Sequence, residues 1–132
     1  MSGQPDGSKG PLDGLRVIDW TMWQFGPVST MMLADMGAEV IKVESLDGDH
    51  GRSVGRSVGL DSTLPNGASA FFEGLNRQKL GIAVNLKTPE GVEIMYKLAV
   101  KSDIFVENFR KGVAERLSLG YEDLIKHNEN II

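Results

Sequence analysis

Short runs of β-branched and other apolar residues alternate along the chain with stretches in which apolar residues recur every three or four positions. The short runs predict four strands, at residues 16–20, 39–43, 82–86 and 103–107. The spaced stretches predict helices between and after them, at residues 27–36, 68–75, 89–99, 113–117 and 121–127. Ile131 and Ile132 look like the first residues of a further strand.

Two of the predicted helices begin with recognisable signals. Pro27 suits the first turn of a helix, where its missing N–H costs no hydrogen bond, and Gly37 ends the same helix. Thr88 is a suitable N-cap, and Pro89 and Glu90 fit the first turn that follows it. Both signals support the positions given by the apolar spacing.

Strands that alternate with helices are joined by crossover connections. Such connections make neighbouring strands parallel, so we expect an α/β fold with a largely parallel sheet and flanking helices. Ligands bind such sheets at the carboxyl ends of the strands. The turns after Trp20, Val43 and Glu107 are therefore the first places to look for a site.

Residues 45–69 are rich in glycine and lack a sustained period, which predicts a long loop. A loop of this length in a compact domain is usually functional or disordered. Arg52 and Arg56 in this loop are candidates for neutralising phosphates, although arginines in flexible loops more often lie in water.

Composition narrows the possible partners. The 132 residues suit one domain, and a net charge of -4 without a basic cluster argues against nucleic acid and membrane surfaces as partners. The absence of cysteine excludes disulfides and thiolate chemistry. Residues 1–11 lack the apolar segment of a secretory signal, so we expect a disordered leader on a cytoplasmic protein. His50 and His127 lack suitably spaced partners, so no metal is expected.

Three polar segments near predicted turns are candidate binding residues. Gln24 follows the first strand at a helix N-terminus, which suits anionic groups, although a loop amide with a capping role is the commoner origin of such a residue. Asn108, Phe109 and Arg110 offer an amide, an aromatic ring and a guanidinium to a nucleotide. A plain turn with a core Phe and a surface Arg is the commoner origin of such a triplet. The basic segment 75–79 is a third candidate, or a solvated connector.

The chain resembles the class III CoA-transferases, a family that includes formyl-CoA transferases, carnitine CoA-transferases and α-methylacyl-CoA racemases. No single matching segment is specific to this family, but the number of matching segments and their order along the chain are. The matching segments are Pro11–Asp19, Gly26–Pro27, Leu33–Glu44, Gly48–Asp49 with Arg52, Phe71–Phe72, Leu75–Arg77, Leu86–Gly91, Val106–Arg110 with Gly112–Val113, and Glu115–Leu117 with Gly120–Tyr121.

This resemblance implies a Rossmann-like domain, truncated relative to the family, in which residues 12–132 form the N-terminal part of the large, CoA-binding domain. It implies coenzyme A or acyl-CoA as substrate, and a supporting catalytic role for Gln24 near the reacting acyl group. It also implies a set of CoA-binding residues: Gln24, Phe25, Leu75, Asn76, Arg77, Gln78, Asn108, Phe109, Arg110 and Arg116. Ser45 stands where the family often has an arginine, so Arg52 or Arg56 is expected to replace that contact.

The resemblance implies a mechanism in which an Asp carboxylate attacks the acyl-CoA thioester. CoA then passes through an aspartyl thioester to an acceptor carboxylate. That Asp follows the Asn-Phe-Arg turn by a few tens of residues, beyond a glycine-rich segment that this chain lacks. Asp19 and Asp35 have the positions of structural residues instead. The chain alone is therefore expected to be inactive.

Two alternative readings stay open at this point. The chain is also compatible with a piece of an α-methylacyl-CoA racemase, or with a noncatalytic module or split subunit that needs a separate C-terminal partner. Full-length relatives are expected to work in acyl-CoA metabolism as homodimers of interlocked chains.

Overall fold

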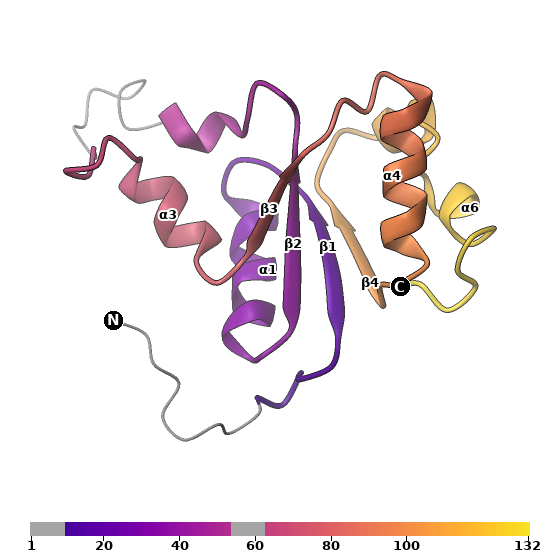
Figure 1. Cartoon of the computed structure of the whole chain (residues 1–132), viewed down its shortest axis with the longest axis horizontal. Coiled ribbons are helices and arrows are strands. Elements are labelled where there is room, and N and C mark those ends of the chain that lie inside the picture. Colours follow the sequence, from indigo (N-terminus) through magenta and orange to yellow (C-terminus); the bar gives the residue numbers. More distant parts are fainter. Residues whose placement is uncertain (1–9, 54–62) are drawn as a thin grey trace.

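The computed structural model describes residues 10–53 and 63–132, and a four-stranded sheet lies at its centre (Figure 1). The strands are β1 (Arg16–Trp20), β2 (Glu39–Glu44), β3 (Leu80–Ala83) and β4 (Ile104–Glu107). They follow the spatial order β3-β2-β1-β4, and every neighbouring pair is parallel. The expected α/β fold with a parallel sheet is confirmed.

Helices cover both faces of this sheet (Figure 1). On one face lie α1 (Phe25–Asp35), α3 (Ala70–Asn76) and the short 3₁₀ helix η2 (His50–Ser53), and on the other lie α4 (Pro89–Ala99), α5 (Val113–Arg116) and α6 (Tyr121–Leu124). Because successive strand residues point to opposite faces, Val17 packs with Ala34 of α1, whereas Ile18 packs with Met95 of α4.

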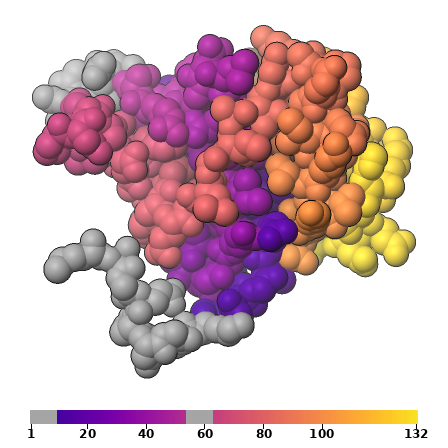
Figure 2. Space-filling model, in the orientation of Figure 1, coloured from indigo at the N-terminus to yellow at the C-terminus, as the bar shows by residue number. Residues whose placement is uncertain are grey.

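The third strand differs from its predicted position. We expected residues 82–86, but the strand comprises Leu80–Ala83, so that expectation was wrong by about two residues. Leu80 pairs with Ile41 at the edge of the sheet, where β3 lies on the surface (Figure 2). At the other end, the Asn85 carbonyl accepts a hydrogen bond from the Thr88 amide, which turns the chain toward α4.

The predicted helix start at Thr88 is confirmed in detail. The Thr88 side chain accepts a hydrogen bond from the Gly91 amide, and Pro89 and Glu90 occupy the first turn of α4. The first helix begins earlier than expected, at Phe25, and α5 and α6 are shorter than expected.

Three further expectations concern less regular parts of the chain. The long loop holds η2, and Thr63 forms an antiparallel bridge with Ser69. The Ile132 amide donates to the Asp103 carbonyl, and the Ile132 carbonyl accepts from the Phe105 amide. A strand parallel to β4 would make these bonds, although no strand is assigned there.

Most of the expected disordered leader, residues 1–9, lies outside the described residues, and so does Arg56.

Candidate functional site

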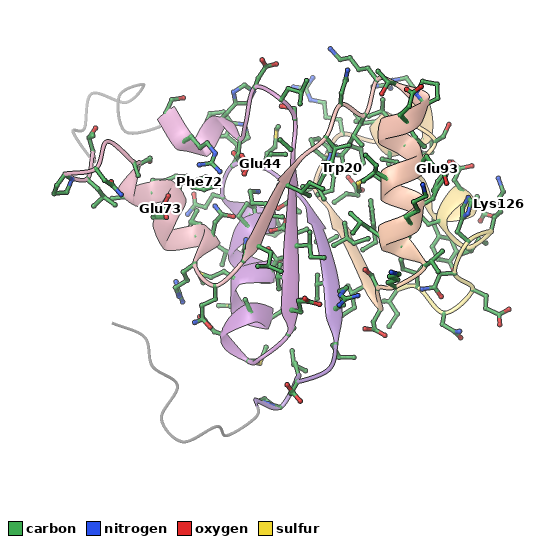
Figure 3. The ribbon with its side chains drawn as sticks, viewed as in Figure 1. Trp20, Glu44, Phe72, Glu73, Glu93 and Lys126 are labelled. Carbon is green, nitrogen blue, oxygen red and sulfur yellow. The ribbon has the colours of Figure 1, made fainter. Side chains whose placement is uncertain are left out.

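A groove of about 430 Å³ runs along the carboxyl ends of the strands. Its walls come from the carboxyl ends of β1 and β2 and from the segments that follow the four strands, namely residues 20–22, 43–49 and 84–87 with Phe109, Val113 and Leu117. Trp20 and Phe109 form an aromatic floor, with ring centroids 4.5 Å apart. Trp20 lies on the side of the sheet that α4 covers (Figure 3). The groove thus combines an apolar base with a rim of polar turns.

The turn between β1 and α1 forms one rim of the groove. Asn108 holds this turn with a two-way contact: its Oδ1 accepts from the Met22 amide at 3.0 Å, and its Nδ2 donates to the Met22 carbonyl at 2.9 Å. Gln24 follows as the N-cap of α1 without a side-chain capping bond, and Phe25 is 88% exposed. The structure therefore brings Gln24, Phe25 and Asn108 to one region.

Two buried charges beneath this turn were missed by the sequence analysis. The Lys42 ammonium lies 2.9 Å from the Asp49 carboxylate, and both side chains are almost fully buried. Lys42 also donates to the Thr21 carbonyl at 2.9 Å. Alternation along β2 places Lys42 on the same inward face as Val40, and that signal was available in the sequence.

A second buried pair joins β1 to the start of β3. The Lys79 ammonium lies 2.8 Å from Asp19, and it also donates to Thr30, Pro27 and Asn76. Burial lowers the pKa of Lys79 below its ordinary value of 10.5, although the nearby Asp19 acts in the opposite direction. Asn76, an expected CoA contact, is thus engaged in this network on the α1 face of the sheet.

Glu44 at the end of β2 is paired with Arg52 of η2. The Arg52 guanidinium donates to both Glu44 carboxylate oxygens and lies 3.7 Å from the centroid of the Phe72 ring (Figure 3 labels Glu44 and Phe72). Burial on its own raises the pKa of Glu44. The hydrogen bonds from Arg52 and from the Asp49 amide outweigh it and hold the pKa below the ordinary 4.5. Arg52 is therefore committed to Glu44 and Phe72 in this structure.

This pairing leads to a pH-dependent prediction. Glu44→Gln should lower the free energy of unfolding by about 1 kcal/mol near pH 7, because half of the Arg52 side chain is exposed and screened. The folded-state pKa of Glu44 is depressed, so its contribution is present above pH 4.5 and fades as the pH falls below it. Urea unfolding at pH 7 and pH 3 measures both values. Glu39→Gln, which breaks an exposed pair with Arg16, is the control and should cost less than about 0.5 kcal/mol at either pH.

The remaining residues of the expected 75–78 segment lie elsewhere. Arg77 pairs with Asp35 at the last turn of α1, and Gln78 donates to the same carboxylate at 3.1 Å. The length of α1, about 16 Å for its 11 residues, separates that turn from Gln24. Leu75 is half-buried in α3. In this arrangement Arg77 and Gln78 anchor the α3–β3 turn to α1.

Arg110 and Arg116 have a different environment. Of the lysines and arginines in residues 10–53 and 63–132, seven are ion-paired, whereas Lys87, Lys101, Arg110, Lys111 and Arg116 are not. Four of these five follow β3 or β4: Lys87 lines the groove itself, and Lys87 and Arg116 line a shallow hollow beside it. Arg110 follows Phe109 of the groove floor directly in the chain.

Neither Asp19 nor Asp35 has the surroundings of a nucleophile. Asp19 is completely buried and accepts from Thr21, Thr30 and Lys79, whereas Asp35 is paired with Arg77. Within the described residues, no group of three or more His, Asp or Glu side chains could hold a metal ion. No helix among the same residues is long and apolar enough to cross a membrane.

A parallel sheet with helices on both faces and a groove at the carboxyl ends of its strands is the arrangement of nucleotide-binding α/β domains. Sequence comparison makes the assignment more specific, because residues 12–132 match CoA-transferase family III. The chain belongs to this family, as its resemblance had indicated.

Characterised relatives agree with this assignment. The chain is 46% identical over 123 residues to the succinyl-CoA:glutarate CoA-transferase of Mus musculus, covering 92% of this chain and 27% of the relative. It is 42% identical to the succinyl-CoA:mesaconate CoA-transferase of Haloarcula marismortui, covering 93% and 31%. The crystal structure of Rv3272 from Mycobacterium tuberculosis superposes with a TM-score of 0.83 at 40% identity, covering 94% of this chain and 33% of that protein. The chain therefore spans only about a third or less of the length of these relatives.

Proposed function

We propose that residues 12–132 form the N-terminal, CoA-binding part of an enzyme that moves CoA between carboxylic acids. In this proposal the chemistry proceeds through an aspartyl intermediate whose Asp lies outside these residues. The donor is an acyl-CoA, the acceptor is a carboxylic acid, and Gln24 supports the reaction from the turn after β1. We further propose that the complete enzyme is a cytoplasmic homodimer that acts in acyl-CoA metabolism.

The position of the unpaired cations Lys87 and Arg116, which line a hollow beside the apolar base of the groove, is the observation that carries this proposal. CoA has an aromatic base, which prefers an apolar surface, and phosphates, which prefer arginine and lysine. Phe109 belongs to the floor of the groove, and Arg110 follows it directly in the chain. Lys87 lines both the groove and the hollow beside it, and Arg116 lines the hollow. The same short stretch of surface thus offers partners for both chemical halves of the ligand.

Calorimetric titration of the chain with CoA tests this proposal. We expect a Kd below about 1 mM, equivalent to about 4 kcal/mol of binding free energy. Arg110→Ala and Arg116→Ala should each weaken binding by about three- to tenfold, because each removes a charge-assisted contact to phosphate. The effect should shrink at high salt, since exposed charges are then screened.

Lys101→Ala is the matched control. Lys101 is also unpaired, but it lies beside the end of α4, away from the groove. Its replacement should change the Kd by less than about twofold. Equal losses for Lys101→Ala and Arg116→Ala would mean that net charge, and not this rim, controls binding. Absence of any CoA binding by the folded chain would contradict the proposal itself.

Two alternatives predict different results for an enzyme that includes these residues. An α-methylacyl-CoA racemase would exchange the α-proton of its substrate in deuterated water, and a CoA-transferase would require a carboxylate acceptor. A noncatalytic module or split subunit would co-purify with a separate C-terminal chain. The Mus musculus and Haloarcula marismortui relatives named above are CoA-transferases, which favours the transferase.

A further inference from the structure

We infer that Lys42 and Asp49 are positioning residues that form a buried clamp on the turn between β1 and α1, and so fix the rim of the groove. The clamp itself is a claim about the turn. Its consequence for ligand binding rests on the proposed function.

The turn has a backbone conformation that needs external support. Trp23 has a φ of 69°, in the left-handed region that bulky side chains rarely adopt. The residue is 46% exposed, and its indole contacts the His50 ring, with ring centroids 5.6 Å apart. Such half-exposed packing gives the backbone limited support, so its hydrogen bonds matter for holding this residue in place.

Lys42 and Asp49 supply that support from opposite ends of the turn. The Lys42 ammonium donates to the Thr21 carbonyl at 2.9 Å, and the Asp49 Oδ1 accepts from the Trp23 amide at 3.1 Å. The ammonium and the Asp49 Oδ2 lie 2.9 Å apart, which links the two contacts into one unit. Asp49 Oδ1 also accepts from the Gly51 amide, which fixes the carboxylate relative to η2.

Simple stabilisation does not account for a charged pair at this place. Burial of two charges carries a desolvation cost, and well-packed apolar side chains are often as stabilising as a buried ion pair. Apolar residues at these positions would leave the Thr21 carbonyl and the Trp23 amide without these partners. The polar pair therefore has a role that packing alone would not perform, namely to bind the backbone of the turn.

The clamp acts together with Asn108, whose side chain hydrogen-bonds to both the amide and the carbonyl of Met22. Three consecutive residues of the turn, Thr21 to Trp23, are thus held by side chains from separate parts of the chain. Gln24 comes next as the N-cap of α1, without a side-chain capping bond, and its carbonyl accepts from the Val28 amide. Its position is therefore set by α1 and by the turn before it. Thr21, Met22 and Asp49 also line the groove, so a displaced turn would change the groove directly.

Hydrogen exchange at the Trp23 amide, followed by NMR, tests the clamp without any ligand. Asp49→Ala removes the acceptor of this amide and should speed its exchange at least about tenfold more than that of the Ile41 amide, which lies between β1 and β2 in the central ladder. Asp49→Asn keeps an acceptor of similar size and should give a smaller increase. It also serves as the folded variant if Asp49→Ala proves too unstable.

Met95→Ala is the matched control for lost stability. Met95 is completely buried against the other face of the sheet and does not touch the turn. Its replacement should not speed exchange of the Trp23 amide by more than about twofold beyond the change seen at Ile41. If Asp49→Ala also left the two amides unequal by no more than that, the clamp would be disproved.

CoA titration of the same variants tests the functional consequence. Asp49→Ala and Lys42→Met should each weaken CoA binding by about tenfold or more, and Met95→Ala should stay within about twofold under conditions where all are folded. Faster Trp23 exchange with unchanged affinity would overturn the positioning role. If the unaltered chain failed to bind CoA, the proposed function would fail, while the exchange experiment would still decide the clamp.

Discussion

Asp19→Asn should lower the free energy of unfolding by about 3–5 kcal/mol, because it leaves the Lys79 cation buried without its counter-charge. Both side chains are almost completely buried, so water cannot take the place of the lost carboxylate. Thr30 retains contacts to Lys79, but a hydroxyl does not neutralise a charge. Denaturant unfolding monitored by circular dichroism gives the value.

The double variant Asp19→Asn/Lys79→Met separates lost pairing from lost packing. It removes both charges and should recover much of the stability that the single variant loses. The deficit of Asp19→Asn should also shrink as the pH rises toward 10.5. Burial already lowers the pKa of Lys79, and without Asp19 the neutral amine forms at a still lower pH. A deficit that stayed constant with pH, together with no recovery in the double variant, would contradict this account.

Gly91→Ala is expected to cost about 2–3 kcal/mol, at the upper end of the range for overpacking. A Cβ atom on Gly91 would lie 2.0 Å from the Asn85 carbonyl oxygen, which is backbone and has no rotamer that avoids the clash. Asn85 belongs to the segment that lines the groove, so the groove should change as well. Thermal unfolding measures the loss of stability, and CoA titration measures the effect on the groove.

The same substitution at Gly74 should have the opposite effect on stability. Gly74 lies in α3, and a Cβ atom there would meet nothing within 4 Å. Alanine should therefore raise the stability by about 0.5–1 kcal/mol through its better helix propensity. If both glycine replacements had the same sign, the contact with Asn85 would not be the cause of the first.

The elements with strong local signals were predictable from the sequence. β1 was placed at its observed bounds because Arg16–Trp20 is a short run that contains the β-branched Val17 and Ile18, and α4 was placed by the cap at Thr88. β3 was misplaced because Leu80 and Gly81, at an exposed sheet edge, do not look like strand residues. Its first residues are defined by pairing with β2, a contact between distant residues that no local pattern reports.

The candidate site was predictable in part for a similar reason. The rule that ligands bind at the carboxyl ends of strands indicated the turns that hold Gln24 and Asn108, and both turns meet in the fold. The family resemblance implied that Arg77 contacts CoA. Its contact with Asp35 could not be predicted, because it depends on how α3 packs against α1. Alternation along β2 indicated that Lys42 points inward, but its pairing with Asp49 and the backbone partners of both side chains are contacts that only the folded chain defines.

The two buried Lys–Asp pairs have a consequence for how this domain can evolve. Residues 19 and 79 are 60 positions apart, yet replacement of either one by an uncharged residue leaves an uncompensated charge at the other. Exchange of both partners for apolar residues avoids that cost, so tolerated substitutions should arise as coordinated pairs. Homologous sequences should therefore show correlated variation between positions 19 and 79 wherever these charges have been replaced, whereas positions 42 and 49 should keep polar side chains that bind the Thr21 carbonyl and the Trp23 amide.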